Sequence, residues 1–365
     1  MGQPVLDFSS ALYLGLQHPW QKLSPWHQMT TGKPAFLEKP GISTLLAKHL
    51  ANTQGLETGI LGTSTLHIFL DLFTLFSSHN TIIYYDQFIY PIIRMGIDRA
   101  NAKGIKTVSF RHHDPSSLIQ CMHKYSHQLT IPIVATEGWC PHCGHPAPLP
   151  AYLNIIKKHN GLLIIDDTQA FGLLGYSPSS TLPYGHNGGG TLKWYNMHSH
   201  RIITVNSLAK AWGVPAAILS GNKQIIKCYK HNSETYIHSS PPSLAHMSAT
   251  INALRENTLN GDARRKKLIQ LVKYFRYKMH QNGIYPKGGI FPVQTIPFSN
   301  RRLVFEMHNY LLKNRIKTVI TTDHSAKNPG LTFILSTGHK KQSIDFMTQL
   351  FQQYLQQHTI TEAPS

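Results

Sequence analysis

The sequence contains no apolar run that approaches the roughly 18 residues needed for a membrane-spanning helix. Its start, Met1 to Asp7, lacks the basic segment followed by an apolar segment that marks a secretory signal. No internal repeat is visible along the chain. We therefore expect no membrane association and, by default, a cytoplasmic location.

Acidic residues are scarce, because the 365 residues include 17 Asp and Glu against 35 Lys and Arg, a formal net charge of +18. Such an excess can serve nucleic-acid binding. The basic residues are scattered, however, and the densest clusters, Arg264–Lys267 and Lys340–Lys341, are typical of solvated helix faces. We expect no nucleic-acid partner.

Cysteine is also rare, with four residues in the chain. Cys140 and Cys143 enclose His142 and precede Gly144 and His145, so this segment resembles half of a zinc site. A structural zinc normally takes four ligands at regular spacing, and the sequence has no second CxxC pair. We expect a cysteine-bearing loop without metal in a reducing compartment, and metal binding by these cysteines and histidines stays an open alternative.

Strand-like and helix-like segments alternate through the middle of the chain, which is the pattern of a mostly parallel sheet covered by helices. The predicted strands are Glu57–Leu61, Thr81–Tyr85, Ile105–Phe110, Thr130–Ala135, Leu162–Asp166, Arg201–Asn206 and Ala216–Ser220. The predicted helices are Thr65–Phe76, Tyr90–Ala102, Ser116–His123 and Ala151–His159. Residues 177–200, rich in Gly, Pro, Ser and His, are expected to form a long irregular excursion between two strands.

After Pro241 and Pro242 the pattern changes to long helices and shorter strands. The predicted helices are Ser243–Glu256, Ala263–Asn282 and Lys341–His358, and the predicted strands are Phe291–Pro297, Lys317–Thr321 and Leu331–Leu335. We therefore predict an α/β fold whose large domain, residues 45–240, holds a mostly parallel seven-stranded sheet flanked by helices. A smaller α+β domain would comprise residues 241–365, joined by the N-terminal segment 1–44.

Lys210 and Asp166 are the residues most indicative of chemistry. Asp166 ends the apolar run Gly161–Ile165, and Lys210 follows the apolar stretch Arg201–Asn206. A lysine just past one strand end can form a Schiff base with pyridoxal 5'-phosphate (PLP), while a carboxylate at another strand end keeps the cofactor's ring nitrogen protonated. The pair alone is weak evidence, because strand-terminal Asp and Lys are common.

Seven motifs in the same order strengthen this interpretation, because together they resemble the α-oxoamine synthase group of fold-type I PLP-dependent enzymes. They are Asp7–Leu16, Phe110–Asp114, Thr136–Gly138 with Ala147–Leu149, Asp166–Gly172, Ser207–Lys210, His238–Pro242 and Leu335–His339. That group includes 8-amino-7-oxononanoate synthase, ketobutyrate-CoA ligase and the autoinducer synthases. The resemblance implies PLP as cofactor, a homodimer with its active site at the subunit interface, an amine or amino-acid substrate, and an acyl-CoA or acyl-carrier thioester.

The resemblance also assigns roles around the cofactor ring. Lys210 would form the Schiff base and then transfer protons, and Asp166 would pair with the ring nitrogen, with Asp167 a solvated neighbour or a loop cap. Tyr90 stands where the group has a histidine stacked on the ring, and an aromatic side chain can still stack there. Gln169 replaces a histidine that bonds the ring hydroxyl; its amide can donate that bond but cannot titrate.

The cofactor phosphate would be held by a helix N-terminus and by hydroxyl groups. The matching positions are Ser64, Thr65, Leu66 and Ser207. Ser239 and Ser240 match a stretch that reaches across the dimer interface in the group. The alternative for these serines and threonines is an ordinary helix cap.

The chain departs from the group's pattern in the pocket for the substrate carboxylate. Ala11 stands in place of an asparagine that touches this carboxylate, and Thr332 in place of an arginine that grips it. A methyl and a hydroxyl cannot replace a guanidinium fork. Either another cation has taken over or the substrate is not a simple α-amino acid. The candidates for such a cation are Arg301, Arg302 and Lys327.

Three functions remain open at this point. The first is an α-oxoamine-synthase-type condensation of an acyl thioester with an amine-bearing carbon, and it is favoured by the motifs. The second is an aminotransferase of related fold. The third is a degenerate homologue, which the joint retention of Lys210, Asp166 and Ser207 disfavours. Pro141, in place of a serine near the ring hydroxyl, and a start close to the opening motif leave the use of CoA less secure than the cofactor.

Overall fold

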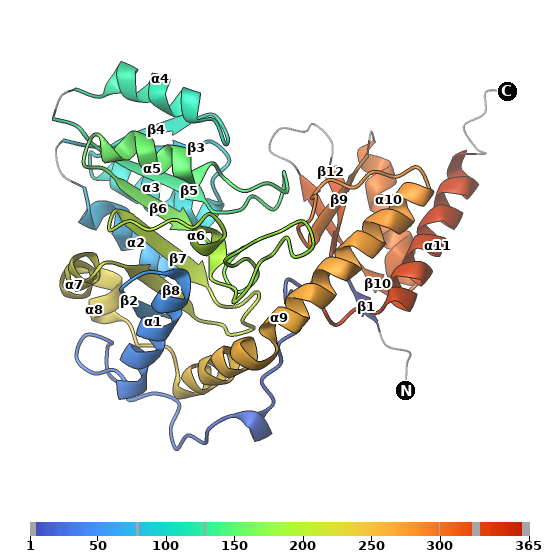
Figure 1. Ribbon diagram of the computed structural model, residues 1–365, viewed down its shortest axis with the longest axis horizontal. Helices are drawn as coiled ribbons and strands as arrows, with labels where there is room; N and C mark the ends of the chain where they lie inside the picture. The colour runs from blue at the N-terminus through green and yellow to red at the C-terminus, as the bar shows by residue number, and fades with distance from the viewer. Residues whose placement is uncertain (1–4, 78–79, 128, 299, 323–328, 360–365) are drawn as a thin grey trace.

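A computed structural model describes residues 5–77, 80–127, 129–298, 300–322 and 329–359. Two groups of elements are joined by one long helix, α9 (Leu244–Gln281), as Figure 1 shows. The larger group is built on a seven-stranded sheet, and the smaller one holds a three-stranded sheet with helices α10 (Arg301–Lys313) and α11 (Lys341–Thr359). Within the described residues no helix has the length and apolarity required to cross a bilayer.

The large sheet is mostly parallel, as predicted. Its strands, from one edge to the other, are β2 (Thr58–Gly62), β8 (Ala217–Gly221), β7 (Ile202–Ser207), β6 (Leu162–Asp166), β5 (Ile131–Glu137), β3 (Thr81–Asp86) and β4 (Lys106–Phe110). Strand β8 is antiparallel to both neighbours, and the remaining pairings are parallel. Because β2 and β7 are each antiparallel to β8, they run in the same direction and end at the same edge of the sheet.

Helices cover both faces of this sheet. One face packs against α2 (Thr65–Leu75), α3 (Pro91–Ala102), α7 (Lys223–Asn232) and α8 (Glu234–His238). The other packs against α1 (Gly41–Gln54), α4 (Pro115–Tyr125), α5 (Leu149–Lys157) and α6 (Gly190–Trp194). All six residues of β3 are buried, as expected for a strand that packs on both sides.

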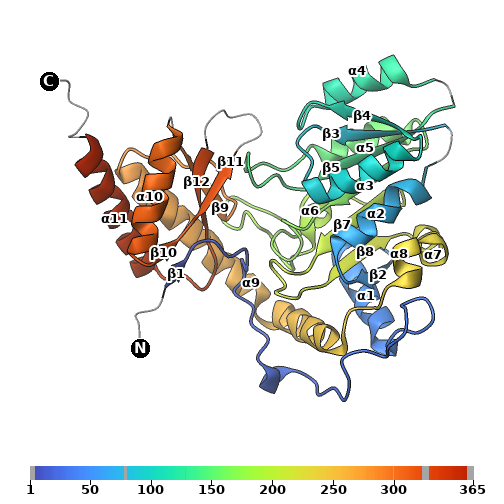
Figure 2. The same cartoon turned by 180° about the vertical axis from the view of Figure 1, so that it is seen from behind.

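The strands and helices predicted for the large sheet occur within two residues of their expected bounds. Helices α1, α7, α8 and α10 were not predicted, and the excursion 177–200 contains the short helix α6. The first strand, β1 (Leu6–Asp7), pairs in parallel with β10 (Ile316–Lys317), and Figure 2 shows the two side by side. The N-terminal segment therefore adds a strand to the C-terminal group; the division of the chain into domains stays a prediction.

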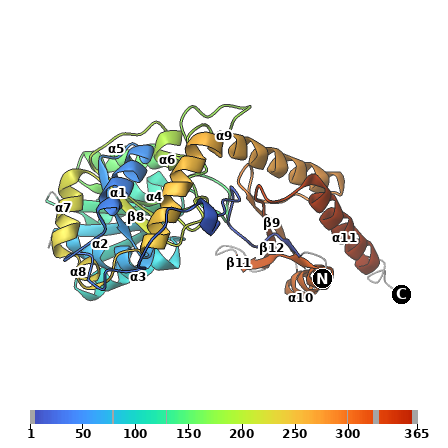
Figure 3. The same cartoon turned by 90° about the horizontal axis from the view of Figure 1, so that it is seen from below.

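The two helices predicted at Ser243–Glu256 and Ala263–Asn282 are wrong, because the structure has a single 38-residue helix there. Gly261, which stands between the two predicted helices, lies inside the helix and is buried. A Cβ at this position would meet Asn257 Oδ1 at 2.6 Å and Arg265 Nη2 at 2.7 Å. The glycine therefore makes room for a packed polar contact rather than ending the helix. Figure 3 shows α9 extending from the large group, where it contacts α1, to the small group, where it contacts α11.

The small sheet is antiparallel, in the order β11 (Val319–Thr322), β12 (Pro329–Ile334) and β9 (Val293–Pro297). The predicted strand Lys317–Thr321 is divided between β10 and β11, with Thr318 between them. Thr318 is buried, and its hydroxyl lies 2.8 Å from His308 Nδ1 on α10. This side-chain contact with the covering helix coincides with the break between the two strands.

Candidate active site

The carboxyl ends of neighbouring strands bring several acidic and hydroxyl side chains to one edge of the large sheet. Strands β3, β5, β6 and β7 end at Asp86, Glu137, Asp166 and Ser207. In the ladder Glu137 lies opposite Asp166, so their backbones are adjacent. Ligands in open α/β sheets bind at this edge. The seven strands thus place the sequence-predicted Asp166 and Ser207 together.

Lys210 reaches the same edge from the loop between β7 and β8, and it is partly buried. Burial lowers the pKa of its amine, and the carboxylates of Asp166 and Glu137 act in the opposite direction. The net result is a lowered pKa. A lysine with a lowered pKa offers more neutral amine at a given pH, which is the form that attacks an aldehyde.

Asp166 is buried, and burial raises the pKa of its carboxyl despite hydrogen bonds from Thr168 and the charge of Lys210. The Thr168 N–H donates to Asp166 Oδ1 over 3.0 Å. The Thr168 hydroxyl in turn accepts from Ser207 N–H over 2.9 Å, so one threonine fixes the ends of β6 and β7 together. A carboxylate buried this way gains from a cationic partner such as a protonated ring nitrogen.

Of the two alternatives for Asp167, a solvated neighbour or a loop cap, the structure excludes the first, because none of the residue is exposed. Its oxygens accept from the backbone N–H of Thr191 over 2.8 Å and from the Thr191 hydroxyl over 2.7 Å. Burial raises the pKa of the Asp167 carboxyl to about 7. The residue caps the first turn of α6, and the chain between β6 and α6 folds back over the strand end to enclose it.

The start of α2 lies at the same sheet edge, since it follows β2. Ser64 occupies the N-cap, and its Oγ accepts from His67 N–H over 3.4 Å. Ser64 Oγ also lies 2.8 Å from His67 Nδ1. Thr65 and Leu66 are the first two helical residues and are partly exposed, so their backbone N–H groups face no helical acceptor. Such a turn can receive a phosphate.

Tyr90 and Gln169 stand where the sequence predicts contacts with the cofactor ring. Tyr90 is the N-cap residue of α3, and its side chain is 52% exposed, so it is not a core tyrosine. Gln169 Oε1 accepts from the hydroxyl of Tyr13 over 2.6 Å. Tyr13 is buried, and burial raises its pKa, so its hydroxyl keeps its proton. Gln169 is thereby held with its amide nitrogen free to donate.

Ser239 and Ser240 follow α8, and Ser239 Oγ donates to the backbone oxygen of Thr235. Both serines line a narrow pocket together with Thr63 and His67, next to the start of α2. No partner chain is described, so their reach across an interface stays a prediction. In the single chain, these serines lie next to the start of that chain's own α2 helix.

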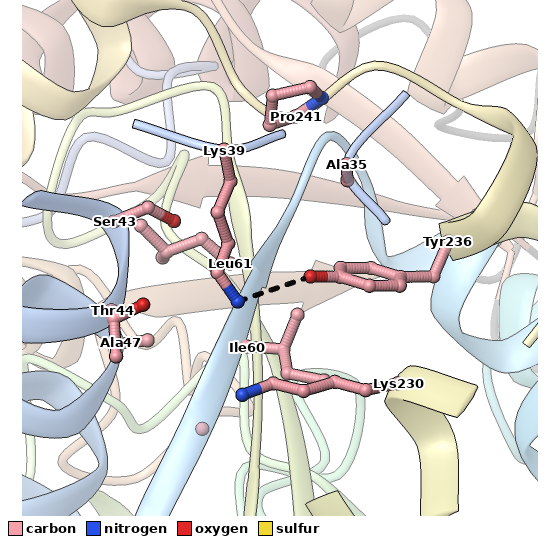
Figure 4. A pocket seen from close by; sticks show the side chains of 11 residues that line it. Ala35, Lys39, Ser43, Thr44, Ala47, Ile60, Leu61, Lys230, Tyr236 and Pro241 are labelled. Atoms are coloured by element: carbon pink, nitrogen blue, oxygen red, sulfur yellow. Dashed lines mark hydrogen bonds between the residues drawn. The ribbon is translucent and has the colours of Figure 1, made fainter. Parts of the chain in front are cut away.

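A second narrow pocket, shown in Figure 4, shares part of this lining. Its polar groups include Lys39, Lys230 and Tyr236, and Lys39 Nζ lies 3.5 Å from the Tyr236 hydroxyl. Burial and the charge of Lys230 lower the pKa of Lys39. Lys210 and Asp166 are not part of its lining. The proposed reacting groups therefore do not line this pocket.

The carboxylate pocket expected at Ala11 and Thr332 contains little that could hold a carboxylate. Thr332 is 1% exposed in the middle of β12, and its hydroxyl bonds the hydroxyls of Thr295 at 2.8 Å and Thr321 at 2.7 Å. Ala11 packs against a hydrophobic cluster that includes residues of both groups. A substrate carboxylate would therefore have to be held by other side chains.

Arg301 and Arg302, the described candidates for a substitute cation, each contact another residue of their own helix rather than Ala11 or Thr332. Arg302 is largely exposed and pairs with Glu306 over 2.6 Å, and Arg301 lies beside the ring of Phe305. Both are at the start of α10. Lys327 lies outside the described residues.

Two residues of the site were missed from the sequence. Glu137 belongs to a quoted motif and ends a strand next to Asp166, and burial followed by the Asp166 charge raises its pKa well above the ordinary value. The same argument that selected Asp166, a carboxylate at the end of an apolar strand, could have found it. Tyr13 gave no such signal, because its contact with Gln169 depends on the fold.

Comparison with known proteins decides the family. The sequence model of the family described as aminotransferase class I and II matches residues 42–327. The chain belongs to this family. The 8-amino-7-oxononanoate synthase of Pseudomonas fluorescens is 26% identical over 308 residues, which cover 81% of this chain and 73% of the relative. That of Alkaliphilus oremlandii is 24% identical over 362 residues, which cover 96% and 87%.

Solved structures agree with this class I and II fold. Serine palmitoyltransferase from Sphingomonas wittichii has a TM-score of 0.83 at 15% identity, covering 98% of this chain and 88% of its own. The 8-amino-7-oxononanoate synthase from Francisella tularensis has a TM-score of 0.75 at 19% identity, covering 97% and 99%. An SPT structure with the PLP internal aldimine has a TM-score of 0.83 at 14% identity, covering 96% and 87%. Together the findings confirm the predicted fold and the family, and the similarity to 8-amino-7-oxononanoate synthases supports the predicted α-oxoamine synthase group.

Proposed function

We propose that this class I and II family member is a PLP-dependent acyltransferase of the α-oxoamine-synthase type, in which Lys210 and Asp166 carry the chemistry. The observation that supports this most strongly is the amine of Lys210 beside the buried carboxylate of Asp166 at the carboxyl edge of the sheet. The start of α2 lies at this edge as well. The substrates would be an amine or amino acid and an acyl thioester.

The residues at this edge fit the cofactor. Asp166 supplies a buried carboxylate whose one cationic neighbour among the described residues is Lys210. Ser64, Thr65 and Leu66 supply a helix N-terminus without an acidic residue in its first turn, which suits a phosphate dianion. Tyr90 supplies an exposed flat ring at the start of α3. When bound, PLP would act as an electron sink for a carbanion at the substrate carbon.

The protein's own groups would then perform three tasks. Lys210 would hold the cofactor and, once displaced by the amine substrate, move a proton to and from the substrate carbon. Asp166 would keep the ring nitrogen protonated by ion pairing in a site with little water. Gln169, fixed by Tyr13, would donate its amide hydrogen to the ring hydroxyl.

We also propose that the protein acts as a homodimer. Tyr90 is 52% exposed and Ser240 is exposed in the single chain, although both match positions near the cofactor. A second subunit would cover them and close the open sheet edge. Size-exclusion chromatography with light scattering distinguishes a dimer from a monomer.

The cofactor assignment is tested by absorbance. Purified protein mixed with PLP should show a visible band from cofactor bound to Lys210, and Lys210→Ala should lack it. Lys158→Ala, which changes an exposed lysine just after α5, is the matched control and should keep the band. Wild-type protein without such a band would refute the assignment.

The reaction type is tested by products. Condensation releases free CoA or acyl carrier from an acyl thioester in proportion to the amine consumed. An aminotransferase, which the family description also covers, instead converts the amine donor to a carbonyl compound only when a keto acid is present. Clear amino transfer without thiol release, across a panel of amine donors, would replace the acyltransferase by the aminotransferase.

A further inference from the structure

A cluster of sulfur and nitrogen atoms lies where the loop after β4 meets the turn after β5. His112 follows β4, and Cys140 and Cys143 lie in the turn after β5. One ligand atom from each of these three residues lies within 4.8 Å of the other two. His112 Nε2 lies 3.5 Å from Cys143 Sγ. All of these residues are buried or partly buried.

The turn that carries the cysteines is ordered by its backbone. Cys143 N–H lies 3.4 Å from Cys140 Sγ, and Gly144 N–H donates to the Cys140 oxygen over 3.0 Å. Cys140 N–H donates to the His145 oxygen over 3.0 Å, which closes a small hairpin. Both thiols are free. The turn therefore presents two sulfur atoms to the same space without a disulfide.

Asp86 orients the third ligand. His112 Nδ1 lies 2.8 Å from Asp86 Oδ1, and the backbone N–H groups of Phe88 and His113 hold the same carboxylate at 2.9 and 3.0 Å. A carboxylate at Nδ1 fixes the ring orientation and leaves the Nε2 lone pair for a metal. That nitrogen is the one that faces Cys143.

We propose that Cys140, Cys143 and His112 bind a zinc ion. A tetrahedral zinc with ordinary Zn–S and Zn–N bonds would separate a sulfur and a nitrogen ligand by about 3.6 Å, and the separation here is 3.5 Å. Two thiolates and an imidazole select zinc among the common divalent ions. Binding releases the two thiol protons, because zinc takes cysteine as thiolate.

The fourth position falls to His113 or to a water molecule. His113 Nδ1 lies 4.0 Å from Cys143 Sγ, and its ring stacks on His112 with 3.7 Å between centroids. His113 Nε2 is buried and has no hydrogen-bond partner among the described residues.

The metal would join three parts of the molecule next to the active site. It ties the β4–α4 loop to the hairpin after β5, and Trp139 of that hairpin stacks on Phe291 of the small group at 5.3 Å. At the hairpin tip, a Cβ on Gly144 would meet the backbone of Gly288 at 2.5 Å. The zinc would therefore be structural, and it would hold the contact between the two groups of elements.

The sequence favoured a loop without metal because the ligands nearest in the chain, His142 and His145, did not complete a regular pattern. The structure brings in His112 from another loop. The His145 side chain is exposed, and its backbone oxygen, rather than its ring, contacts the turn. The third ligand is therefore distant in sequence.

The first experiment measures metal in full-length protein by inductively coupled plasma mass spectrometry. We expect close to one zinc per chain, and loss of most of it in Cys140→Ser, Cys143→Ser and His112→Asn. Cys121→Ser and Cys228→Ser change the other two cysteines and should keep the zinc. Wild-type protein without zinc after growth in zinc-supplemented medium would overturn the proposal, as would a Cys140–Cys143 disulfide.

A second set of variants identifies the third ligand. His142→Asn and His145→Asn should keep the zinc if His112 is the ligand. Loss of zinc in either of these variants, together with retention in His112→Asn, would assign the site to the local histidines and refute the geometry. Asp86→Asn should still bind one zinc at saturation but with about 10- to 100-fold lower affinity.

Spectroscopy on the wild type covers the case in which a cysteine variant fails to fold. Replacement of zinc by cobalt should give thiolate-to-cobalt charge transfer and the visible bands of a tetrahedral site. Bands of an octahedral site without sulfur would contradict the ligand set. Lys210→Ala should retain full zinc content, so failure of the zinc site and failure of the proposed cofactor chemistry are separable.

Discussion

The hydroxyl of Tyr13 donates to Oε1 of Gln169 over 2.6 Å, which connects the N-terminal segment to the end of β6. The bond fixes which end of the Gln169 amide faces the proposed cofactor ring. Without it, the amide could turn and present its oxygen, an acceptor, where a donor is needed. An ordinary hydrogen bond from a residue remote in sequence thus determines the polarity of the site.

Tyr13→Phe should therefore weaken PLP binding about 3- to 10-fold, as expected for one lost hydrogen bond in a buried position. Fluorescence titration with PLP measures the change. Tyr184→Phe is the matched control, since Tyr184 is also a buried tyrosine with one hydrogen bond, to the Ile290 oxygen. Equal losses of affinity in both variants would indicate a general packing effect.

Asp166→Asn should retain cofactor binding but lower turnover by at least about 100-fold. The amide cannot form an ion pair with a protonated ring nitrogen, so the ring would take up electrons less well. Steady-state rates with saturating PLP and substrates measure the effect. A rate within a few-fold of the wild type would show that Asp166 does not carry this role.

Asp167 predicts a pH dependence of stability. Burial raises its pKa from 3.8 to about 7 in the folded protein. Because the folded state binds the proton more tightly than the unfolded state, the stabilisation is complete below about pH 4 and is lost as the pH rises through about 7. Above that pH, the buried charge of Asp167 lowers the free energy of unfolding.

Asp167→Asn removes this titration. The stability of the variant relative to the wild type should therefore rise between pH 4.5 and pH 8.5, by a few kcal/mol, the free energy that corresponds to a pKa shift of this size. Urea unfolding across this range is the measurement. Comparing the variant with the wild type at each pH cancels the contributions of the other titrating groups, including Asp166, to the free energy of unfolding. A difference that does not change with pH would show that Asp167 keeps an ordinary pKa.

Gly261→Ala should destabilise the protein although alanine is the better helix former. The expected propensity gain is about 1 kcal/mol, but the new Cβ would meet Asn257 Oδ1 and Arg265 Nη2 at 2.6 and 2.7 Å. Overpacking of this kind costs about 1–3 kcal/mol. Thermal unfolding should show a lower midpoint than the wild type.

Gly41→Ala is the control for that substitution. Gly41 is the first residue of α1, and a Cβ there would meet nothing within 4 Å. Its stability should stay equal or rise slightly. If both alanine variants are equally stable, the contact of Gly261 with Arg265 is not constraining.

The parallel part of the fold was predictable because its strands are short apolar runs that end in polar residues. Asp166 closes one such run, and the structure ends β6 at this residue. The direction of β8 was not readable, since an apolar run looks the same in a parallel and an antiparallel strand. The continuity of helix α9 was not readable either, because Gly261 is a weak helix former and its packing against Arg265 is a tertiary effect.

The candidate site was predictable where a residue acts through its own position in the chain. Lys210 and Asp166 follow strand ends, and neighbouring parallel strands bring such ends together. Contacts between loops were not predictable. The approach of His112 to Cys143 and the bond between Tyr13 and Gln169 depend on how separate segments pack, and no local pattern encodes them.

The unbroken helix α9 has a mechanical consequence. Its 38 residues span about 57 Å. Arg265 donates to the Gly172 oxygen in the chain that follows β6, which ties the middle of the helix to the large group, and its bond to Asn257 stays within the helix. The helix therefore has no hinge at Gly261. If the small group closed over a substrate, helix α9 would have to tilt as a rigid body, or the chain would have to bend after the helix ends at Gln281. The angle between the two groups is therefore set by a continuous helix rather than by a flexible linker.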